Sequence, residues 1–297
     1  MKDICAAFIR YNYSKKSLIR NINKIKNQVN KIFIIDNSKK KINVSDKKIK
    51  YVYLGENYGI AHAQNFAIFQ AIKEKFKYIL LSDQDTFFPK YYIKKMKFFL
   101  KKKDVAAVCP NLYDINKKKT LGLTLRYFCF KKNLNDDYNI NQKLVNIKSE
   151  FISESMASGT IIKLSLIKEI GYMNDDLFLD WVDFEWCWKL KDKNKKIVGV
   201  KNIFARHKLG TNKIKIFNKI YHRHSLIRYY YIIRNGFLLS IYGRNIKSFW
   251  RINIFFNTLK YLIGALIINN FSKDSIKLFF KAFFNGLINQ KGKLMKF

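Results

Sequence analysis

Proline and glycine are scarce in this sequence, which has two prolines and twelve glycines among 297 residues. This composition argues against long flexible linkers between domains. The four cysteines form no CxxC pair and no zinc-ligand spacing, and no apolar leader precedes the first expected strand. We therefore expect a protein of the reducing cytoplasm. Because 48% of the residues are hydrophobic, the chain can bury the core of one large domain, or of one domain with an appendage.

Acidic residues are also few: the chain has 21 of them beside 58 basic residues, which gives a net charge of +37. Only nine of the basic residues are arginine. Arginine makes bidentate contacts to guanine or phosphate, whereas lysine is a solvated point charge. Since no helix-turn-helix, zinc-finger, KH or RNP pattern is present, we expect no specific nucleic-acid binding, and we favour an anionic membrane surface as the partner of this charge. A basic polyanion-binding protein without catalysis is the alternative of a different class.

Short apolar runs alternate with amphipathic stretches in the first third of the chain. This alternation is typical of βαβ units, and it predicts an α/β fold with a Rossmann-like, mostly parallel central sheet flanked by helices. A further helix is expected after residue 160, ending at Ile170. In the first third, strands are expected at residues 4–9, 31–35, 49–54, 77–81 and 105–109, and helices at residues 14–29, 59–76 and 89–101.

Polar side chains follow three of these strands at their carboxyl ends. They are Arg10-Tyr11-Asn12, Asp36-Asn37 and Asp83-Gln84-Asp85. The functional groups of open α/β sheets gather at this edge. The carboxylates of Asp83 and Asp85 can converge on one Mg²⁺ or Mn²⁺ ion, because these ions prefer oxygen ligands. A capped turn after the strand is the structural alternative.

Three later features also bear on binding. A glycine turn at residues 57–59 leads into the second expected helix, whose N-terminal N–H groups favour an anion such as a diphosphate. Residues 111–155 are polar and weakly periodic, and we expect them to form an acceptor-binding excursion. His207 is either a metal or diphosphate ligand or a structural histidine. The segment His222-Arg223-His224 has no acidic neighbour in sequence, which favours a solvated or phosphate-contacting surface.

A second acidic cluster, made of Asp180, Asp183 and Glu185, lies among aromatic residues. If a helix begins near Asp180, the i, i+3 spacing places Asp180 and Asp183 on one face, and Glu185 points elsewhere. A sugar transfer with inversion needs one carboxylate that takes the proton from the attacking hydroxyl, whereas a glycosidase needs a pair of carboxylates flanking the bond. Acids that complement the dipole of a helix N-terminus are the structural alternative.

Together these residues resemble glycosyltransferase family 2, the inverting GT-A enzymes, and within it the rhamnosyltransferase-like branch. Arg10 stands where the family usually has threonine, and Val182 stands where many members have glutamate. The resemblance spans roughly residues 3–240. The segments that carry it are Asp36-Asn37-Ser38, residues 57–65, Asp83-Gln84-Asp85, Ser158-Gly159, residues 180–186, His207 followed by Gly210, and residues 228–235.

The resemblance implies roles for individual residues. Asp85 would hold the metal, Asp83 would contact the metal or the ribose, and His207 would bind the metal or help to neutralise the leaving diphosphate. Asp183 would be the catalytic base, with Asp180 as the reserve candidate. The nucleotide-sugar donor would be contacted by residues of the strand ends and of the helix that follows the glycine turn, namely Arg10, Tyr11, Asn12, Asp36, Asn37, Asn57, Gly59, Asn65 and Asp83.

The implied activity is that of a metal-dependent, inverting hexosyltransferase of bacterial surface polysaccharide synthesis. The expected reaction moves L-rhamnose from dTDP-L-rhamnose to a glycan or lipid-linked acceptor, and a UDP-hexose-dependent transferase of the same fold is the alternative. The nucleotide-sugar half is expected at about residues 1–110, the acceptor half at about residues 111–240, and a C-terminal membrane-associating region at residues 241–297.

No long hydrophobic run is present in the C-terminal region, where the longest covers residues 261–268. Because a spanning helix needs about 20 apolar residues, we expect basic amphipathic helices that lie in the interface of the inner face of the plasma membrane. Packing on the catalytic domain, or on a second subunit of a homo-oligomer, is the alternative. The apolar side of these helices is expected to comprise Phe249, Trp250, Phe255, Phe256, Leu278, Phe279, Phe280, Phe283 and Phe284.

Overall fold

The structure is a computed structural model that describes residues 2–116, 118–120, 123–127, 130–133, 149–207, 213–216 and 219–294. In the first part of the chain, strands alternate with helices. The elements are β1 (Lys2–Arg10), α1 (Lys15–Ile25), β2 (Lys31–Asp36), β3 (Ile49–Tyr53), α2 (Ile60–Lys73), β4 (Phe76–Asp83), β5 (Thr86–Phe87), α3 (Tyr92–Lys97), β6 (Val105–Asp114) and β7 (Lys119–Thr120).

The later part of the chain contributes further strands and then three long helices. Its elements are β8 (Thr124–Tyr127), β9 (Phe130–Asn133), β10 (Ser149–Ile152), β11 (Ile161–Lys163), α4 (Ile167–Ile170), α5 (Val182–Asp192), β12 (Lys196–His207), β13 (Lys213–Ile216), β14 (Lys219–His222), α6 (Leu226–Tyr242), α7 (Ser248–Ile268) and α8 (Lys273–Leu287).

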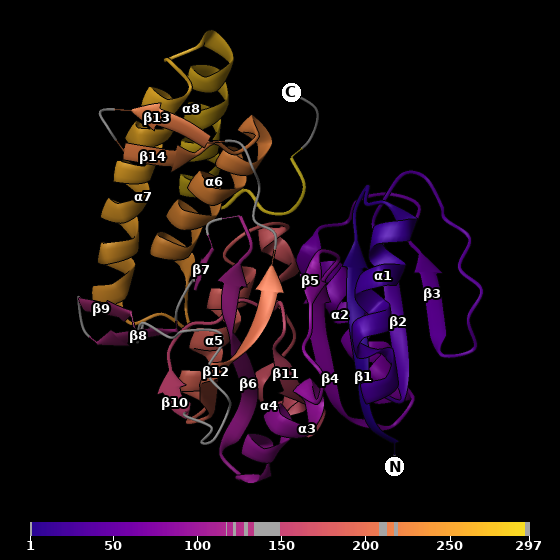
Figure 1. Cartoon of the computed structure of the whole chain (residues 1–297). Helices are drawn as coiled ribbons and strands as arrows, with labels where there is room; N and C mark the ends of the chain where they lie inside the picture. The colour runs from indigo at the N-terminus through magenta and orange to yellow at the C-terminus, as the bar shows by residue number, and fades with distance from the viewer. Residues whose placement is uncertain are drawn as a thin grey trace.

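One central sheet organises these elements. Its strands follow the order β10, β12, β6, β11, β4, β1, β2, β3, with β5 paired to β12 and β7 paired to β6. Helices flank the sheet, and α6, α7 and α8 gather at one end of the molecule (Figure 1). This mixed α/β arrangement confirms the predicted fold class.

The parallel strands β3, β2, β1 and β4 form the first half of the sheet. Alternate residues of β1 face opposite helices: Ala6 and Phe8 pack in the cluster that contains α1, whereas Cys5 and Ala7 pack in the cluster that contains α2. Both faces of such a strand are therefore apolar, as in other parallel sheets covered on two sides. All five strands expected in the first third of the chain are present.

The segment after residue 160 differs from the prediction. Ile161–Lys163 form a strand, β11, which pairs antiparallel with both β4 and β6 before the short helix α4 begins. Ile161 and Ile162 are buried between these neighbours, and burial of β-branched side chains in a sheet outweighs the weak helical preference of the segment. The loop that precedes β11 is thereby placed beside the carboxyl end of β4.

Two helices begin later than the sequence indicated. The helix expected at residues 89–101 starts at Tyr92 and ends in a 3₁₀ turn, and the helix expected near Asp180 starts at Val182. In each case the preceding residue is a non-glycine with positive φ: Tyr91 at 60° and Trp181 at 64°. A left-handed residue interrupts the right-handed helix, so the helix can start only after it.

Strand β12 carries a distant part of the chain to the carboxyl end of β4. It runs parallel to β6, with a register irregularity between Val200 and Phe204. Its last residue, His207, then pairs with Thr86 of β5 in antiparallel register. His207 is therefore brought beside Asp83-Gln84-Asp85, more than 120 residues earlier in the sequence.

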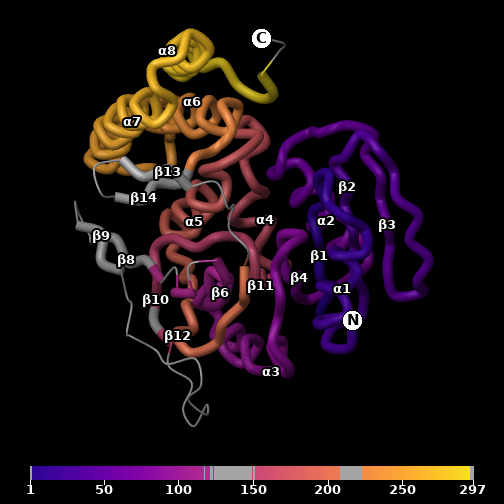
Figure 2. Tube along the Cα trace, turned by 45° about the horizontal axis from the view of Figure 1, so that its top comes forward, coloured from indigo at the N-terminus to yellow at the C-terminus, as the bar shows by residue number. Residues whose placement is uncertain are grey.

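The three C-terminal helices share a core of their own. Helix α6 packs against both α7 and α8, and its Tyr229, Tyr230 and Phe237 are buried with Phe279 of α8. Figure 2 shows α6, α7 and α8 side by side, above α5. The boundary expected at residue 240 falls inside α6, which ends at Tyr242.

The apolar side expected for these helices is divided between the core and the surface. Leu278 and Phe279 are buried, whereas Phe249, Phe256, Phe280 and Phe284 are exposed. Helix α7 is nevertheless long and apolar enough, by length and composition, to cross a membrane, and 28% of its apolar window is buried in the protein. Buried helices of soluble proteins pass the same test, so α7 alone does not establish a membrane span.

Three of the four cysteines, Cys5, Cys109 and Cys187, are free thiols buried in the core. Burial raises the pKa of each thiol well above its ordinary value. These residues therefore behave as small apolar side chains, which agrees with the absence of metal-ligand spacing in the sequence.

Candidate functional site

The site is built around the carboxyl end of β4, where Asp83 ends the strand and Asp85 follows in the turn to β5. The Nε2 atom of His207 lies 3.3 Å from Oδ2 of Asp83 and 3.2 Å from Oδ1 of Asp85. The three potential ligand atoms all lie within 4.8 Å of one another. Two carboxylate oxygens and one imidazole nitrogen at this spacing fit a divalent cation such as Mg²⁺ or Mn²⁺.

The protonation of His207 reflects the same geometry. Burial by itself would lower the pKa of this histidine, but hydrogen bonds and charges from Asp83 and Asp85 outweigh it and raise the pKa to about 10. The imidazolium is thus the cation that balances the two carboxylates when no metal is held. A metal ion at this place would take over that charge and displace the proton.

The loop before β11 supports the acidic turn from behind. The side-chain oxygen of Ser158 accepts a hydrogen bond from the backbone N–H of Asp83 at 3.2 Å and lies 2.5 Å from the hydroxyl of Thr86. Gly159 has a φ of +87°, and a Cβ atom there would lie 2.7 Å from Cγ of Pro110. Glycine is required here by conformation and by space, which fixes the predicted Ser158-Gly159 segment against the acidic turn.

Asp183 lies in the first turn of α5, close to the same loop. Its Oδ2 accepts a hydrogen bond from the backbone N–H of Ala157 at 2.9 Å. Burial, together with the negative charges of Asp83 and Asp180, raises the pKa of Asp183 to about 7. No ion pair with a basic side chain is present for Asp183 in the described part of the chain. A carboxyl group with these properties can accept a proton near neutral pH.

Asp180 does not share a helical face with Asp183, because it lies before α5 and has a φ of 58°. Arg228 of α6 holds its carboxylate with a fork of contacts: Nε lies 3.3 Å and 3.1 Å from the two oxygens, and Nη2 lies 2.9 Å from Oδ1. The charge of Asp83 also acts on Arg228. The two aspartates therefore differ in environment, although the sequence places them only three residues apart.

The segment from residue 177 to residue 181 is held by α6. The side-chain amide of Asn235 donates to the carbonyl oxygens of Leu177, Leu179 and Asp180 at 2.9, 2.7 and 3.2 Å. The buried guanidinium of Arg234 donates to the carbonyl of Leu177 at 3.1 Å. The site residues Arg228, Arg234 and Asn235 were missed as individuals, although the segment at residues 228–235 was part of the resemblance.

This segment also contacts the glycine turn. Phe178, Asp180 and Trp181 all have positive φ, which is strained for residues with side chains. The carbonyl oxygen of Phe178 accepts a hydrogen bond from the N–H of Ile60 at 2.7 Å, and a Cβ atom at Gly59 would lie 2.6 Å from that oxygen. The glycine is thus required for the close approach of the acidic segment to the start of α2.

The glycine turn is fixed by two asparagines. The side-chain oxygen of Asn57 accepts from the N–H of Gly59 at 2.9 Å. The side chain of Asn37, which follows β2, donates to the carbonyl of Gly59 at 2.8 Å and accepts from the N–H of Tyr58 at 3.3 Å. These contacts tie the turn to the end of β2, as expected for polar clusters at one edge of the sheet.

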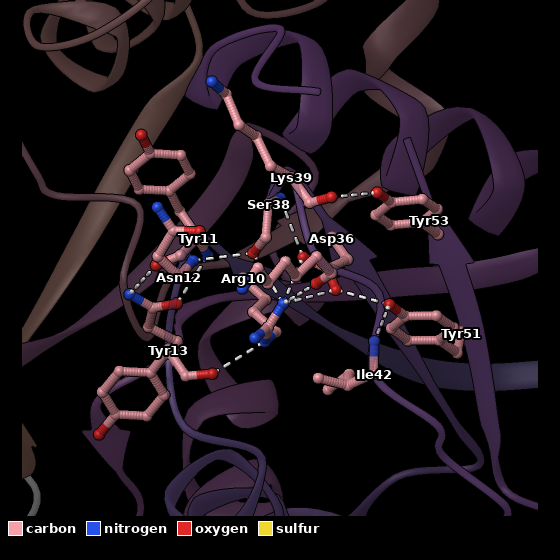
Figure 3. A network of polar contacts seen from close by, with 12 residues as sticks. Arg10, Tyr11, Asn12, Tyr13, Asp36, Ser38, Lys39, Ile42, Tyr51 and Tyr53 are labelled. Atoms are coloured by element: carbon pink, nitrogen blue, oxygen red, sulfur yellow. Dashed lines mark hydrogen bonds and ion pairs between the residues drawn. The ribbon is translucent and has the colours of Figure 1, made fainter. Parts of the chain in front are cut away.

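The end of β1 meets the ends of β2 and β4. The N–H of Tyr11 donates to the side-chain oxygen of Gln84 at 2.7 Å, and the N–H of Asn12 donates to the hydroxyl of Ser38 at 2.8 Å. Nearby, Nη1 of Arg10 lies 2.7 Å from Oδ2 of Asp36, with both side chains buried (Figure 3). The three predicted strand-end clusters therefore meet in one place.

Two further residues that the sequence analysis named, Asn65 of α2 and Glu185 of α5, lie outside this group. The amide of Asn65 donates to the carbonyl of Met173 at 2.9 Å, and its oxygen accepts from the N–H of that residue at 2.8 Å, so it joins α2 to the segment before α5. Glu185 is buried and pairs with Lys189 at 3.1 Å, and burial raises its pKa. Of the Arg206–Gly210 segment, residues 208–210 lie outside the described residues, as does the side chain of His222.

The chain belongs to glycosyl transferase family 2: the model of this family matches residues 7–159, more than half of the chain. It is similar to the dTDP-rhamnosyl transferase RfbF of Shigella flexneri, with 28% identity over 243 residues that cover 80% of this chain and 79% of that protein.

Solved structures share the fold. The structure of GalNAc-T7 with UDP, GalNAc and Mn²⁺ matches 72% of this chain with a TM-score of 0.56 and 12% identity, and this chain spans 44% of its length. A fragment of S. aureus TarS in complex with UDP-GlcNAc matches 97% of this chain and 82% of its own, with a TM-score of 0.54 and 15% identity.

These findings confirm the predicted family and the GT-A type of α/β fold. The protein is a glycosyltransferase that uses a nucleotide-sugar donor.

Proposed function

We propose that the protein is a metal-dependent, inverting transferase of bacterial surface polysaccharide synthesis. It moves L-rhamnose from dTDP-L-rhamnose to a hydroxyl group of a glycan or lipid-linked acceptor. The observation that carries this proposal is the convergence of Asp83, Asp85 and His207 at the carboxyl end of β4. The similarity to the dTDP-rhamnosyl transferase of Shigella flexneri supports rhamnose as the sugar. A UDP-hexose is the competing donor.

Asp83, Asp85 and His207 hold the divalent cation in this proposal. Mg²⁺ or Mn²⁺ held by these residues would neutralise the charge of the diphosphate leaving group. His207 has to release the proton that its raised pKa retains, so protons and the cation compete for the site. The charge of Arg228 interacts with that of Asp83, and Arg228 adds a fixed positive charge on the side of α6.

Asp183 is the proposed base. It takes the proton of the acceptor hydroxyl while the oxygen of that hydroxyl bonds to the anomeric carbon and the bond from this carbon to the diphosphate breaks on the opposite face. A single displacement of this kind inverts the configuration, and it needs one carboxylate only. Asp180 is the weaker candidate, because Arg228 contacts both of its oxygens, and an acceptor hydroxyl would have to compete with these charged hydrogen bonds.

Several of the other residues expected to contact the donor lie around these groups. Tyr11 is half exposed at the end of β1, and the turn made by Asn57 and Gly59 opens into the N-terminus of α2. In the proposal this edge of the sheet receives the nucleotide, with Asn12 and Asn37 fixing the backbone of the pocket wall. The acceptor binds on the side of α5 and the Ser158-Gly159 loop.

The test is a panel of donors with and without metal. Transfer and thermal stability are measured with dTDP-L-rhamnose, UDP-glucose and UDP-galactose, each in Mn²⁺, in Mg²⁺ and in a chelator. The preferred donor should raise the melting temperature only when a divalent cation is present, because a ligand that binds the folded state alone stabilises it. Saturable transfer from a UDP-hexose with none from dTDP-L-rhamnose would refute the rhamnose assignment, and equal transfer in chelator would refute metal dependence.

We also propose that the protein binds the inner face of the plasma membrane through α7 and α8, beside a lipid-linked acceptor. The exposed apolar residues of α7 recur with helical spacing along one stripe. Lysines of the same helices can meet anionic headgroups, each contributing about 1 kcal/mol near the surface. The stripe on α7 comprises Phe249, Ile252, Phe256, Ile263 and Ile267, and the one on α8 comprises Ile276, Phe280 and Phe284.

Flotation with liposomes tests this placement. The full chain should float with anionic vesicles at low salt, and the variant with Phe256→Glu and Phe280→Glu should not. Phe69→Glu is the matched control, since Phe69 is an equally exposed phenylalanine on α2. If the full chain ignores anionic vesicles at low salt, or if the double variant floats as well as the control, the membrane proposal is wrong.

A further inference from the structure

Asp36, the last residue of β2, is completely buried, and both of its carboxylate oxygens are occupied. Oδ1 accepts hydrogen bonds from Nη1 of Arg10 at 2.9 Å and from the N–H of Ser38 at 3.0 Å. Oδ2 accepts from the same guanidinium nitrogen at 2.7 Å and from the hydroxyl of Tyr51 at 2.6 Å. Figure 3 shows this carboxylate enclosed between Arg10 and Tyr51.

Arg10 is equally well held on its own side. Its Nε donates to the carbonyl of Tyr13 at 2.9 Å, and its Nη1 donates to the hydroxyl of Ser38 at 2.7 Å and to the carbonyl of Lys40 at 3.2 Å. Only 6% of the residue is exposed. The ion pair therefore fixes the loops that follow β1 and β2 on both sides of the carboxylate.

The occupation of Asp36 matters for nucleotide recognition. A carboxylate reads a nucleobase by accepting one of its N–H groups, so it needs a free lone pair directed at the base. Here a neutral base N–H would have to displace a charged guanidinium N–H, which makes the stronger hydrogen bond. It would also weaken the pairing of the buried charge of Arg10 with Asp36, and that is unfavourable.

We propose that Arg10 is a specificity-determining residue of the donor pocket, because it occupies the carboxylate of Asp36 and thereby prevents this acid from selecting the nucleobase. This inference rests on the proposed donor site at the same strand ends. Asp36, which was expected to contact the donor, is then not a reader of the base. In this chain the acid organises the loops instead.

The variant Arg10→Thr tests whether Asp36 only organises the loops or can also read the base. In Arg10→Thr the guanidinium is gone, and Asp36 keeps only Tyr51 and Ser38 as partners. Its freed lone pairs can then accept the ring N–H of uracil at N3, whereas cytosine presents a lone pair at that nitrogen and is repelled. The ratio of the affinities for UDP and CDP should therefore rise at least about tenfold, the effect of one hydrogen bond to a charged group.

The experiment measures the dissociation constants of UDP, dTDP and CDP with Mn²⁺ by titration calorimetry, for the full chain and its variants. The double variant Arg10→Gln with Asp36→Asn removes both charges together, a change that buried pairs often tolerate. Under the proposal the double variant keeps the wild-type ratio of UDP to CDP within about threefold, since the acid never reads the base. Asp46→Asn is the matched control, because it removes another loop carboxylate, paired with Lys26, outside this network.

The outcomes are distinct. If the folded Arg10→Thr variant keeps the wild-type ratio, or if the double variant lowers that ratio by more than about threefold, Asp36 is not controlled by Arg10 as proposed. If Arg10→Thr does not fold, the double variant alone decides the question by the same ratio. If the wild-type chain binds none of the three nucleotides, the proposed donor site itself is wrong, and that result does not resemble a changed ratio between them.

Discussion

The two acidic clusters of this enzyme differ in how the negative charges of their carboxylates are compensated. Asp83 and Asp85 share one cationic neighbour, His207, which lies within 3.3 Å of both carboxylates. In the second cluster, one acid is neutralised and the other is not: Arg228 holds Asp180, whereas Asp183 has a backbone N–H and no ion pair among the described residues. Clustering of like charges therefore fits the proposed cation site in one place and the proposed proton acceptor in the other.

The comparison shows that partners, rather than residue type, determine what a carboxylate can do. A carboxylate that pairs with a guanidinium has its oxygens occupied by charged hydrogen bonds, while one that is buried beside other acids holds its proton to a higher pH. Asp180 and Asp183 are three residues apart, and the left-handed backbone at residues 180 and 181 directs them into these two environments.

The largest expected effect is a loss of the transfer rate when an acid of the first cluster is replaced. Asp85→Ala should lower the rate of transfer at least about a hundredfold, because the charge on the leaving diphosphate loses its principal stabiliser. Steady-state kinetics with saturating Mn²⁺ measure the loss, and thermal unfolding checks the fold. Asp104→Asn is the control, since this partly exposed acid directly precedes β6 and pairs with Lys196, the first residue of β12. A variant that keeps more than about a tenth of the wild-type rate would remove Asp85 from the mechanism.

A second prediction tests the difference between Asp183 and Asp180 inside the second cluster. Asp183→Asn should reduce kcat about a hundredfold or more without weakening donor binding, since it removes a proton acceptor and little volume. Asp180→Asn should cost less, and it should act through the loosened Arg228. Parallel measurements of kcat and of the dissociation constant for the donor nucleotide decide between the two acids. If Asp180→Asn is inactive and Asp183→Asn is active, the two assignments must be exchanged.

A third prediction concerns the support that α6 gives to the second cluster. Asn235→Ala removes the amide that donates to three carbonyl groups of the segment at residues 177–180, and should lower the free energy of unfolding by about 1–3 kcal/mol. The carbonyl of Leu177 keeps the guanidinium of Arg234 as a donor. Asn285→Ala is the matched control, because that amide makes one hydrogen bond, to the hydroxyl of Tyr230. Urea unfolding gives both values. Equal losses in the two variants would show that the three-carbonyl contact has no special weight.

The smallest expected effect is a pH dependence of kcat/KM, which tests the assignment of Asp183 as the base. Because the pKa of Asp183 is raised to about 7, the residue is protonated below that pH and cannot accept the hydroxyl proton. The value of kcat/KM should therefore rise with pH and level off once the pH exceeds the pKa. A cation held by Asp83 would add positive charge nearby and would shift the inflection to lower pH. Asp183→Asn should lack this rise, and an unchanged profile in the variant would contradict the assignment.

The parallel half of the sheet was predictable because its signals are local. Each strand of that half is a short apolar run followed by polar residues, and the first acidic turn is visible as Asp83-Gln84-Asp85 directly after one such run. The resemblance then supplied His207, whose distance from the turn in sequence gives no spatial information. Only the pairing of β12 with β5 brings it into contact.

The remainder depended on long-range contacts that no local pattern encodes. The sequence suggested a helical face shared by Asp180 and Asp183, but the contacts of Asn235 with residues 177–180 hold a left-handed backbone there instead. The occupation of Asp36 by Arg10 likewise joins residues from two strands. The departure of Arg10 from the family pattern was the available signal, and its meaning became clear only from its partner.

The reactivity of the three cysteines that the structure shows to be buried can report local opening of the protein. Cys5 lies in β1, Cys109 in β6 and Cys187 in α5, so each thiol samples a different part of the core. A thiol reagent reacts with the exposed thiolate, and these groups become reactive only when their surroundings open. Labelling rates, read separately for each cysteine by mass spectrometry, would therefore time the opening of the sheet and of the helix that carries Asp183 without any engineered probe.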